Sequence, residues 1–170
     1  MSREFDLRAT TLADAPRVLE LHRAAASAPG SGLAREADEM ALEYIEEALA
    51  KALAQGVAIS AWAGDAIAGE IHASRLGPRQ FAHNLLDLTI AVHPDWQGKG
   101  VGGRLFEALF AQAATLTPKV ERVELMVRAG HTGAIRLYQR MGFAIEGRFD
   151  RRVRLKDGTV EADLAMAKFL

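Results

Sequence analysis

The sequence predicts a mixed α/β fold in which a mostly antiparallel sheet of about seven strands is flanked by about four helices. Three observations support this prediction. Short alternating apolar segments lie among longer segments with helical apolar spacing, turn residues join neighbouring strands, and residues 85–128 form one strand–helix–strand unit. The chain has 170 residues, of which 49% are hydrophobic and 25% charged. This size and composition suit a single domain over residues 1–170.

The N-terminal third predicts one strand and two helices. Residues 5–9 alternate well enough for a short strand, and Thr11 is suited to cap the helix that follows. Apolar residues then recur at helical spacing over residues 13–28. Residues 28–38 contain proline and glycine and predict a loop, after which a second helix is expected over residues 39–54.

The middle of the chain predicts a three-stranded meander followed by a helix and a strand. Short apolar runs separated by turn residues occupy residues 56–92, which is typical of antiparallel strands. After the glycines, one apolar helical face runs from Val101 to the neighbourhood of Thr115, and residues 122–128 alternate as a strand.

The last part of the chain predicts a helix and a hairpin. An apolar stripe ends at Met141, and Gly142 lies where a left-handed helix cap is expected. Residues 143–170 then form two strands joined at residues 156–159, where Asp-Gly favours a tight turn.

Composition excludes several classes of function. The chain has 21 basic and 22 acidic residues without a long block of either charge, so we expect neither a nucleic-acid nor a membrane partner. It has no cysteine, which excludes disulfides, thiolate metal sites and a cysteine nucleophile. No signal-peptide pattern and no apolar run of about 18 residues is present, so we expect a soluble cytoplasmic protein.

The histidines give no sign of a metal site. His22, His72, His83 and His93 lack metal-ligand spacing, and we interpret them as surface or sheet residues and expect no bound metal. His72 and His83 lie on or beside the predicted sheet, where either could serve as a base.

A dense glycine cluster is the main functional signal. The stretch VHPDWQGKGVGGRL, residues 92–105, places four glycines within six positions at a strand-to-helix turn. Small residues there let backbone N–H groups converge on an anion at the positive end of a helix, which favours a phosphate ligand. A nucleotide P-loop is excluded because Lys99 is followed by Gly100 rather than by Ser or Thr.

Two ligands remain for the glycine loop. A dinucleotide motif is matched by Gly98, Gly100 and Gly103, but Arg128 stands where a ribose-binding acid is expected, so an NAD(P)-dependent oxidoreductase is the less favoured alternative. Residues 92–105 instead resemble the Q/R-x-x-G-x-G/A acyl-CoA loop of the GNAT superfamily of N-acetyltransferases, and residues 134–143 resemble its second motif.

This resemblance covers nearly the whole chain and implies a function. It implies direct transfer of an acetyl group from acetyl-CoA, as co-substrate, to the primary amine of a small molecule such as an amino acid. In that case the backbone of the glycine loop holds the pyrophosphate, the preceding strand pairs with the pantetheine, and a histidine replaces the usual Asn of the second motif. The residues assigned to acetyl-CoA are Ile90, Ala91, Val92, Gln97, Gly98, Lys99, Gly100, Val101, Gly102, Gly103 and His131.

The resemblance also implies two catalytic residues. Tyr138 matches the tyrosine that protonates the departing coenzyme A thiolate, although an inward aromatic could instead be a core residue. Asp87 lies in an apolar strand where many relatives carry an acid, and it could take the amine proton through a water. Strict alternation places Asp87 on the opposite face from its apolar neighbours, and a bulge would break that parity.

The acceptor and the assembly are less determined by the sequence. Arg148, Arg151, Arg152 and Arg154 could bind a carboxylate, although a solvated edge strand is the commoner reason for such a pattern. The alternatives are a protein or peptide N-acetyltransferase and a non-catalytic acyl-CoA-binding module. A homodimer is possible, since dimers are common in the superfamily that the chain resembles.

Overall fold

The computed structural model describes residues 4–170 and contains seven strands and four α-helices within that range. Helices and strands follow the predicted order, and four short 3-10 turns lie between them. Their bounds are β1 Asp6–Ala9, α1 Ala15–Ser27, α2 Leu42–Gln55, β2 Gly56–Ala63, β3 Ala66–Ser74, β4 Asn84–Val92, α3 Val101–Ala113, β5 Arg122–Arg128, α4 Thr132–Arg140, β6 Ala144–Arg154 and β7 Val160–Phe169.

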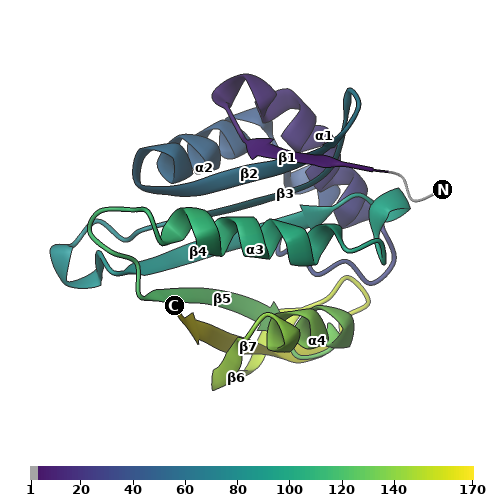
Figure 1. The fold of residues 1–170 in the computed structure, drawn as a ribbon. Coiled ribbons are helices and arrows are strands. Elements are labelled where there is room, and N and C mark those ends of the chain that lie inside the picture. Colours follow the sequence, from purple (N-terminus) through teal and green to yellow (C-terminus); the bar gives the residue numbers. More distant parts are fainter. Residues whose placement is uncertain (1–3) are drawn as a thin grey trace.

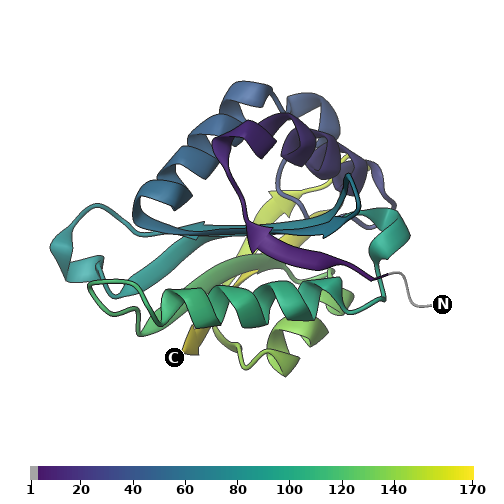
Figure 2. The same ribbon diagram turned by 45° about the horizontal axis from the view of Figure 1, so that its top comes forward.

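The strands form one sheet in the order β1-β2-β3-β4-β5-β7-β6 (Figure 1). Every adjacent pair is antiparallel except β4 and β5, which are joined by α3 as the predicted crossover unit. Figure 2 shows α1 and α2 on one face of the sheet and α3 and α4 on the other. The predicted fold class is therefore confirmed.

The sheet opens between β4 and β5. These strands pair only at Asn84 with Arg122 and at Leu85 with Val123, although β4 continues to Val92 and β5 to Arg128. At the start of the opening, the register between β3 and β4 shifts and Asp87 adopts a φ of 49°. Such an irregularity bends a strand away from its neighbour. Beyond Leu85, the edge of β4 that faces β5 therefore has no strand partner among residues 4–170.

Two apolar clusters hold the layers together. One lies between the sheet and the helices α3 and α4, with Phe106 at its centre in contact with the rings of Phe110, Tyr138 and Phe143 at centroid distances of 5.6–5.8 Å. The other joins α1 and α2 to the opposite face. Each helix is therefore fixed by its own apolar stripe, which places the ends of α3 and α4 beside the opening.

Local signals fix the element ends. Thr11 and Asp14 form a capping box before α1, and Gly142, with a φ of 92°, ends the chain's fourth helix as expected. The predicted start of the second helix at residue 39 was too early, because residues 37–39 form a separate 3-10 turn and α2 begins at Leu42.

We predict that Phe106→Ala lowers the free energy of unfolding by about 3–5 kcal/mol, because it removes a fully buried ring and leaves a cavity among three others. Urea denaturation followed by circular dichroism measures this loss. Phe149→Ala is the matched control, since Phe149 is 46% exposed and its replacement should cost about 0.5 kcal/mol or less. Equal losses in the two variants would contradict this account of the core.

Candidate active site

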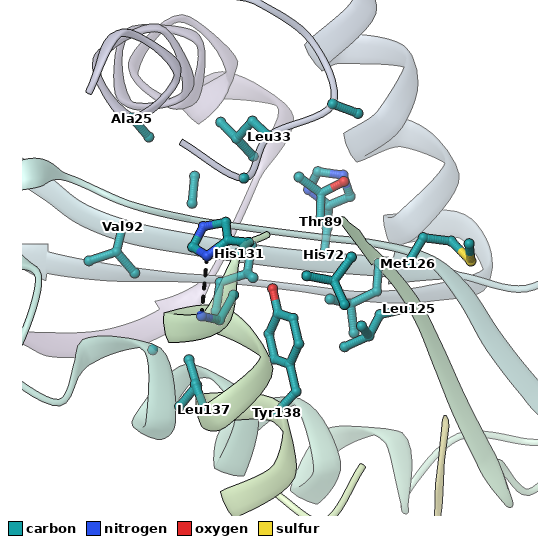
Figure 3. Close-up of a pocket in the computed structure, with 18 of the residues that line it drawn as sticks. Ala25, Leu33, His72, Thr89, Val92, Leu125, Met126, His131, Leu137 and Tyr138 are labelled. Atoms are coloured by element: carbon teal, nitrogen blue, oxygen red, sulfur yellow. Dashed lines mark hydrogen bonds between the residues drawn. The ribbon is translucent and has the colours of Figure 1, made fainter. Parts of the chain in front are cut away.

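A cavity of about 1280 Å³ lies where β4 and β5 diverge. The glycine loop and α4 line one end, and residues from α2, β3 and the bulged part of β4 line the other. Figure 3 shows Tyr138 of α4 and His72 of β3 among the residues around this cavity. A drug-sized ligand needs about 300–1000 Å³. The cavity therefore has room for a large co-substrate together with a second, smaller molecule.

The glycine loop presents free backbone donors to this cavity. Gly100 caps α3 with a φ of 81°, and Gly98 has a φ of 71°, so both need a conformation that other residues rarely adopt. A Cβ at either position would meet no protein atom within 4 Å, so the space beside the loop is open. The first helical bond runs from the Arg104 N–H to the Gly100 carbonyl, which leaves the preceding N–H groups available to an anion.

Gly102 has a different role from the other loop glycines. A Cβ at this position would lie 3.1 Å from Cδ2 of Leu137 on α4. Gly102 therefore allows α3 and α4 to approach each other closely, and its sequence-based assignment to the ligand site remains a prediction. A Cβ on Gly103, in contrast, would meet no protein atom within 4 Å.

The polar side chains of the loop turn back onto the protein. The Gln97 amide donates to the Val92 carbonyl at 3.4 Å, which ties the loop to the end of β4. The Lys99 ammonium donates to the Asp95 carbonyl and lies 5.3 Å from the centre of the Trp96 ring. The donors that the loop offers to the cavity are thus its backbone N–H groups rather than the Lys99 side chain.

His131 caps α4 and supports the loop that follows α1. Its Nδ1 accepts a hydrogen bond from the Ala134 N–H at 3.2 Å (Figure 3). Burial and the nearby charge of Arg128 lower the pKa of His131, which favours the neutral acceptor form. A Cβ on Gly32 would lie 2.0 Å from Cδ2 of the ring, so only glycine permits this approach. His131 thus caps α4 and also lines the cavity.

Tyr138 projects from α4 into the cavity. Its ring is edge-on to Phe106 at 5.7 Å and to Phe143 at 6.2 Å, and the residue is 9% exposed. The hydroxyl has no hydrogen-bond partner within residues 4–170 and points into the cavity in Figure 3. Burial raises the pKa of Tyr138 to about 12, so the phenol keeps its proton at neutral pH. The ring of Tyr138 therefore packs in the core, and the catalytic role of its hydroxyl remains a prediction.

Asp87 lies at the opposite end of the cavity from the glycine loop. Its side chain is 61% exposed and forms an ion pair with Lys51 of α2. Asp87 faces α2, whereas Leu88 and Ile90 pack against the core on the α3 side, so the alternation predicted for these residues is kept. Exposure and the ion pair thus explain how a carboxylate is accommodated in this strand.

Three buried polar side chains form a cluster beneath the cavity. Glu70 of β3 is fully buried, and its carboxylate lies 3.1 Å from Nε2 of His22 on α1 and 3.0 Å from Nδ1 of His72 on β3. The two imidazole rings are nearly parallel, with centroids 6.1 Å apart. The interpretation of His22 as a surface or sheet residue was wrong, because the apolar face of α1 carries it into the interior.

The ionisation of this cluster follows from its hydrogen bonds. Burial by itself would raise the pKa of Glu70, but the charge of His72 and the bonds from both imidazoles outweigh it and lower the pKa to about 2. The ligand atoms of these three residues lie within 4.8 Å of one another, which is also the spacing of a metal site. Distances of 3.0–3.1 Å between nitrogen and oxygen are those of hydrogen bonds, so the carboxylate is satisfied by its neighbours alone.

Sequence reasoning missed Glu70. The available signal was its position two residues before His72 in an apolar strand, which places both side chains on one face. The arginines of the C-terminal hairpin lie elsewhere, on the exposed edge strand β6 and outside the cavity lining. Arg148 pairs with Asp150 and Arg152 with Asp163, which supports the interpretation of a solvated edge.

Comparisons with known proteins agree with this geometry. The family model described as Acetyltransferase (GNAT) family matches residues 16–143. A probable spermine N(1)-acetyltransferase of Bacillus subtilis subsp. natto is 42% identical over 59 residues, which cover 35% of this chain and 38% of that relative. The match thus spans little more than a third of the relative's length.

Solved structures show the same fold at low sequence identity. An acetyltransferase of the GNAT family from Streptococcus pneumoniae superposes with a TM-score of 0.85 at 23% identity, over 98% of this chain and all of the other. A phosphinothricin acetyltransferase from Sinorhizobium meliloti, solved with acetyl-CoA, gives a TM-score of 0.83 at 20% identity, over 100% of this chain and 89% of the other. None of the helices in residues 4–170 is long and apolar enough to cross a bilayer.

We predict that acid destabilises the protein through Glu70. The folded pKa lies below the unfolded value of 4.5, so the stabilising contribution is present above pH 4.5 and is lost as the pH falls toward about 2. Urea denaturation at intervals between pH 6 and pH 2.5 should therefore show a steeper loss of stability in the wild type than in Glu70→Gln. Parallel profiles for the two proteins would contradict an ionised Glu70 in the folded state.

Proposed function

The chain belongs to the acetyltransferase (GNAT) family, whose members are acyl-CoA-dependent N-acetyltransferases, and we propose that it transfers an acetyl group from acetyl-CoA to the primary amine of a small molecule. The observation that carries this proposal is the cavity at the opening between β4 and β5, with phosphate-type donors at one end and carboxylates at the other.

The glycine loop and β4 are the proposed acetyl-CoA site. Free N–H groups of residues 98–103 bind the pyrophosphate at the positive end of α3. The edge of β4 that lacks a strand partner, including Ile90, Ala91 and Val92, pairs with the amide groups of the pantetheine as an added strand would. Gln97 holds the loop against Val92, and His131 bounds the site from α4.

The proposed reaction joins the amine nitrogen to the thioester carbon and breaks the carbon–sulfur bond. The nucleophile must be the neutral amine, so a base removes one proton, and the leaving thiolate takes another. Tyr138 supplies the second proton, because its hydroxyl is directed into the cavity and stays protonated at neutral pH. The sequence-based assignment of Asp87 as a base acting through a water remains a prediction.

The end of the cavity beside α2 is the proposed acceptor site. It is lined by the carboxylates of Glu47 and Asp87, which suit a cationic amine. The ammonium group of Lys51 also lines it and forms an ion pair with Asp87. The partial match to a relative named as a spermine acetyltransferase supports a small amine. We favour this over carboxylate recognition by the hairpin arginines, which lie outside the cavity lining. A cytoplasmic location and a homodimer remain predictions.

Calorimetric titration with acetyl-CoA, with NADH in a parallel experiment, tests the proposed co-substrate. A thiol-release assay across polyamines, amino acids and lysine peptides then tests the acceptor. We expect saturable binding of acetyl-CoA alone and release of coenzyme A with a small amine. Binding of NADH in preference to acetyl-CoA, or turnover with peptides only, would contradict the proposal.

We predict that Tyr138→Phe lowers kcat by about 10²–10⁴-fold, the range expected for a lost proton donor. The substitution keeps the ring that packs on Phe106 and Phe143, so thermal stability and acetyl-CoA affinity should stay close to wild type. Steady-state kinetics and calorimetry on the same preparation separate these quantities. An unchanged kcat would exclude an essential acid role for Tyr138.

A further inference from the structure

We propose that His72 is the catalytic base that takes the proton of the acceptor amine, and that the buried Glu70 and His22 position it. This inference rests on the proposed acetyl transfer and adds to it a second titrating group. His72 lines the same cavity as Tyr138 but belongs to β3, on the α1 and α2 side of the sheet. The proton acceptor and the proton donor therefore approach the reaction centre from different layers of the fold.

Hydrogen bonding fixes which nitrogen of His72 is free. Nδ1 lies 3.0 and 3.1 Å from the two oxygens of Glu70. An ionised carboxylate can only accept, so Nδ1 carries the proton of the neutral ring and Nε2 keeps its lone pair. Nε2 has no hydrogen-bond partner in the part of the chain that the structure describes, and it is not among the polar atoms sealed from solvent. A free lone pair at the cavity wall is what a base requires.

The strand register places this lone pair near the opening of the sheet. His72 pairs with Thr89 of β4, so the two side chains share a face, and Figure 3 shows them adjacent on the cavity wall. Thr89 is immediately before Ile90, where the proposed pantetheine site begins. An amine that attacks a thioester held along β4 from the acceptor side would thus reach the carbon beside His72.

The buried carboxylate is difficult to explain by packing alone. Removing a carboxylate fully from water costs several kcal/mol, and apolar residues occupy the neighbouring core positions. His22 reaches Glu70 from α1 and satisfies one oxygen, while His72 uses the remaining capacity. The result is a carboxylate that orients one imidazole and fixes its tautomer, as in enzymes that use histidine as a base.

The charges around His72 match this role. Burial lowers the pKa of His72, but the carboxylate of Glu70 on the same strand outweighs this effect, and Asp87 on β4 adds to the increase. His22, from α1, is the other titratable group that faces the cluster. The pKa of His72 therefore lies above its ordinary value of 6.5, nearer to that of the amine that it must deprotonate.

The protons balance in this scheme. The neutral amine gives its proton to Nε2 of His72 as the nitrogen–carbon bond forms, and Tyr138 protonates the sulfur as the carbon–sulfur bond breaks. The imidazolium of His72 then returns its proton through solvent to the phenolate of Tyr138, so amine and thioester give amide and thiol with no net change in protons. Since His72 must be neutral to accept the proton, the rate should fall as the pH drops through its raised pKa.

The test compares His72→Asn with the wild type across pH 5.5 to 9.5, using the amine that gives turnover in the thiol-release assay. The Asn amide can replace Nδ1 as a donor to Glu70, so the buried carboxylate keeps a partner while the base is removed. His83→Asn is the matched control, because His83 is an exposed histidine outside the cavity lining. Calorimetry with acetyl-CoA and thermal denaturation report whether each variant is folded.

We expect His72→Asn to lower kcat/KM for the amine by about 10²–10⁴-fold and to remove the acid limb of the profile, with acetyl-CoA affinity unchanged. Glu70→Gln should move the limb to lower pH, because it removes the main charge that raises the pKa of His72. Asp87→Asn should keep the acid limb of the pH profile and move it only slightly to lower pH, because Asp87 adds less than Glu70 to the increase in the pKa of His72.

Four results would overturn this assignment. A folded His72→Asn variant with the wild-type rate and limb would exclude His72, and loss of the limb in Asp87→Asn alone would identify Asp87 as the base. Loss of wild-type activity with EDTA and its recovery with zinc would identify the cluster as a metal site. If the wild type binds acetyl-CoA but acetylates no amine, the proposed function itself fails, and this assignment fails with it.

Discussion

The structure depends on the short pairing between β4 and β5. These strands hold together at only two positions, and every component of the candidate site lies at the opening that follows. A continuous sheet would satisfy the backbone of β4 with a neighbouring strand and leave no edge for a ligand. The opening is tolerated because each of the two strands keeps its other neighbour. β4 stays paired with β3, and β5 stays paired with β7.

The opening also explains the division of the molecule into two halves. The crossover helix α3 begins at the glycine loop, packs on β2 and β3 of the first half, and returns the chain to β5 of the second. The packing of α3 against α4, which Gly102 permits, keeps the N-terminal ends of both helices at the cavity. The rings of Phe106 and Phe143 also pack under these helices, and Phe106 contacts the ring of Tyr138.

A second constraint is the charge of Glu70. The interior of the α1 and α2 layer is otherwise built mainly from Ala, Val, Leu and Ile, and the carboxylate is stable there only because two imidazoles surround it. The same arrangement links α1 to the wall of the cavity. The carboxylate of Glu70, which is costly to bury, therefore lies directly behind the imidazole of His72, which faces the proposed acceptor. Such an arrangement is common in active sites.

The sequence by itself determined the order of the elements, the crossover unit, the glycine loop and the family resemblance, because these depend on local periodicity and on short contiguous motifs. It did not determine the role of residues whose meaning depends on distant partners. His22 and Glu70 are 48 positions apart and meet only when α1 packs on β3. The ion pair between Asp87 and Lys51 and the packing role of Gly102 likewise arise from contacts between elements, and such contacts leave no pattern in any single segment.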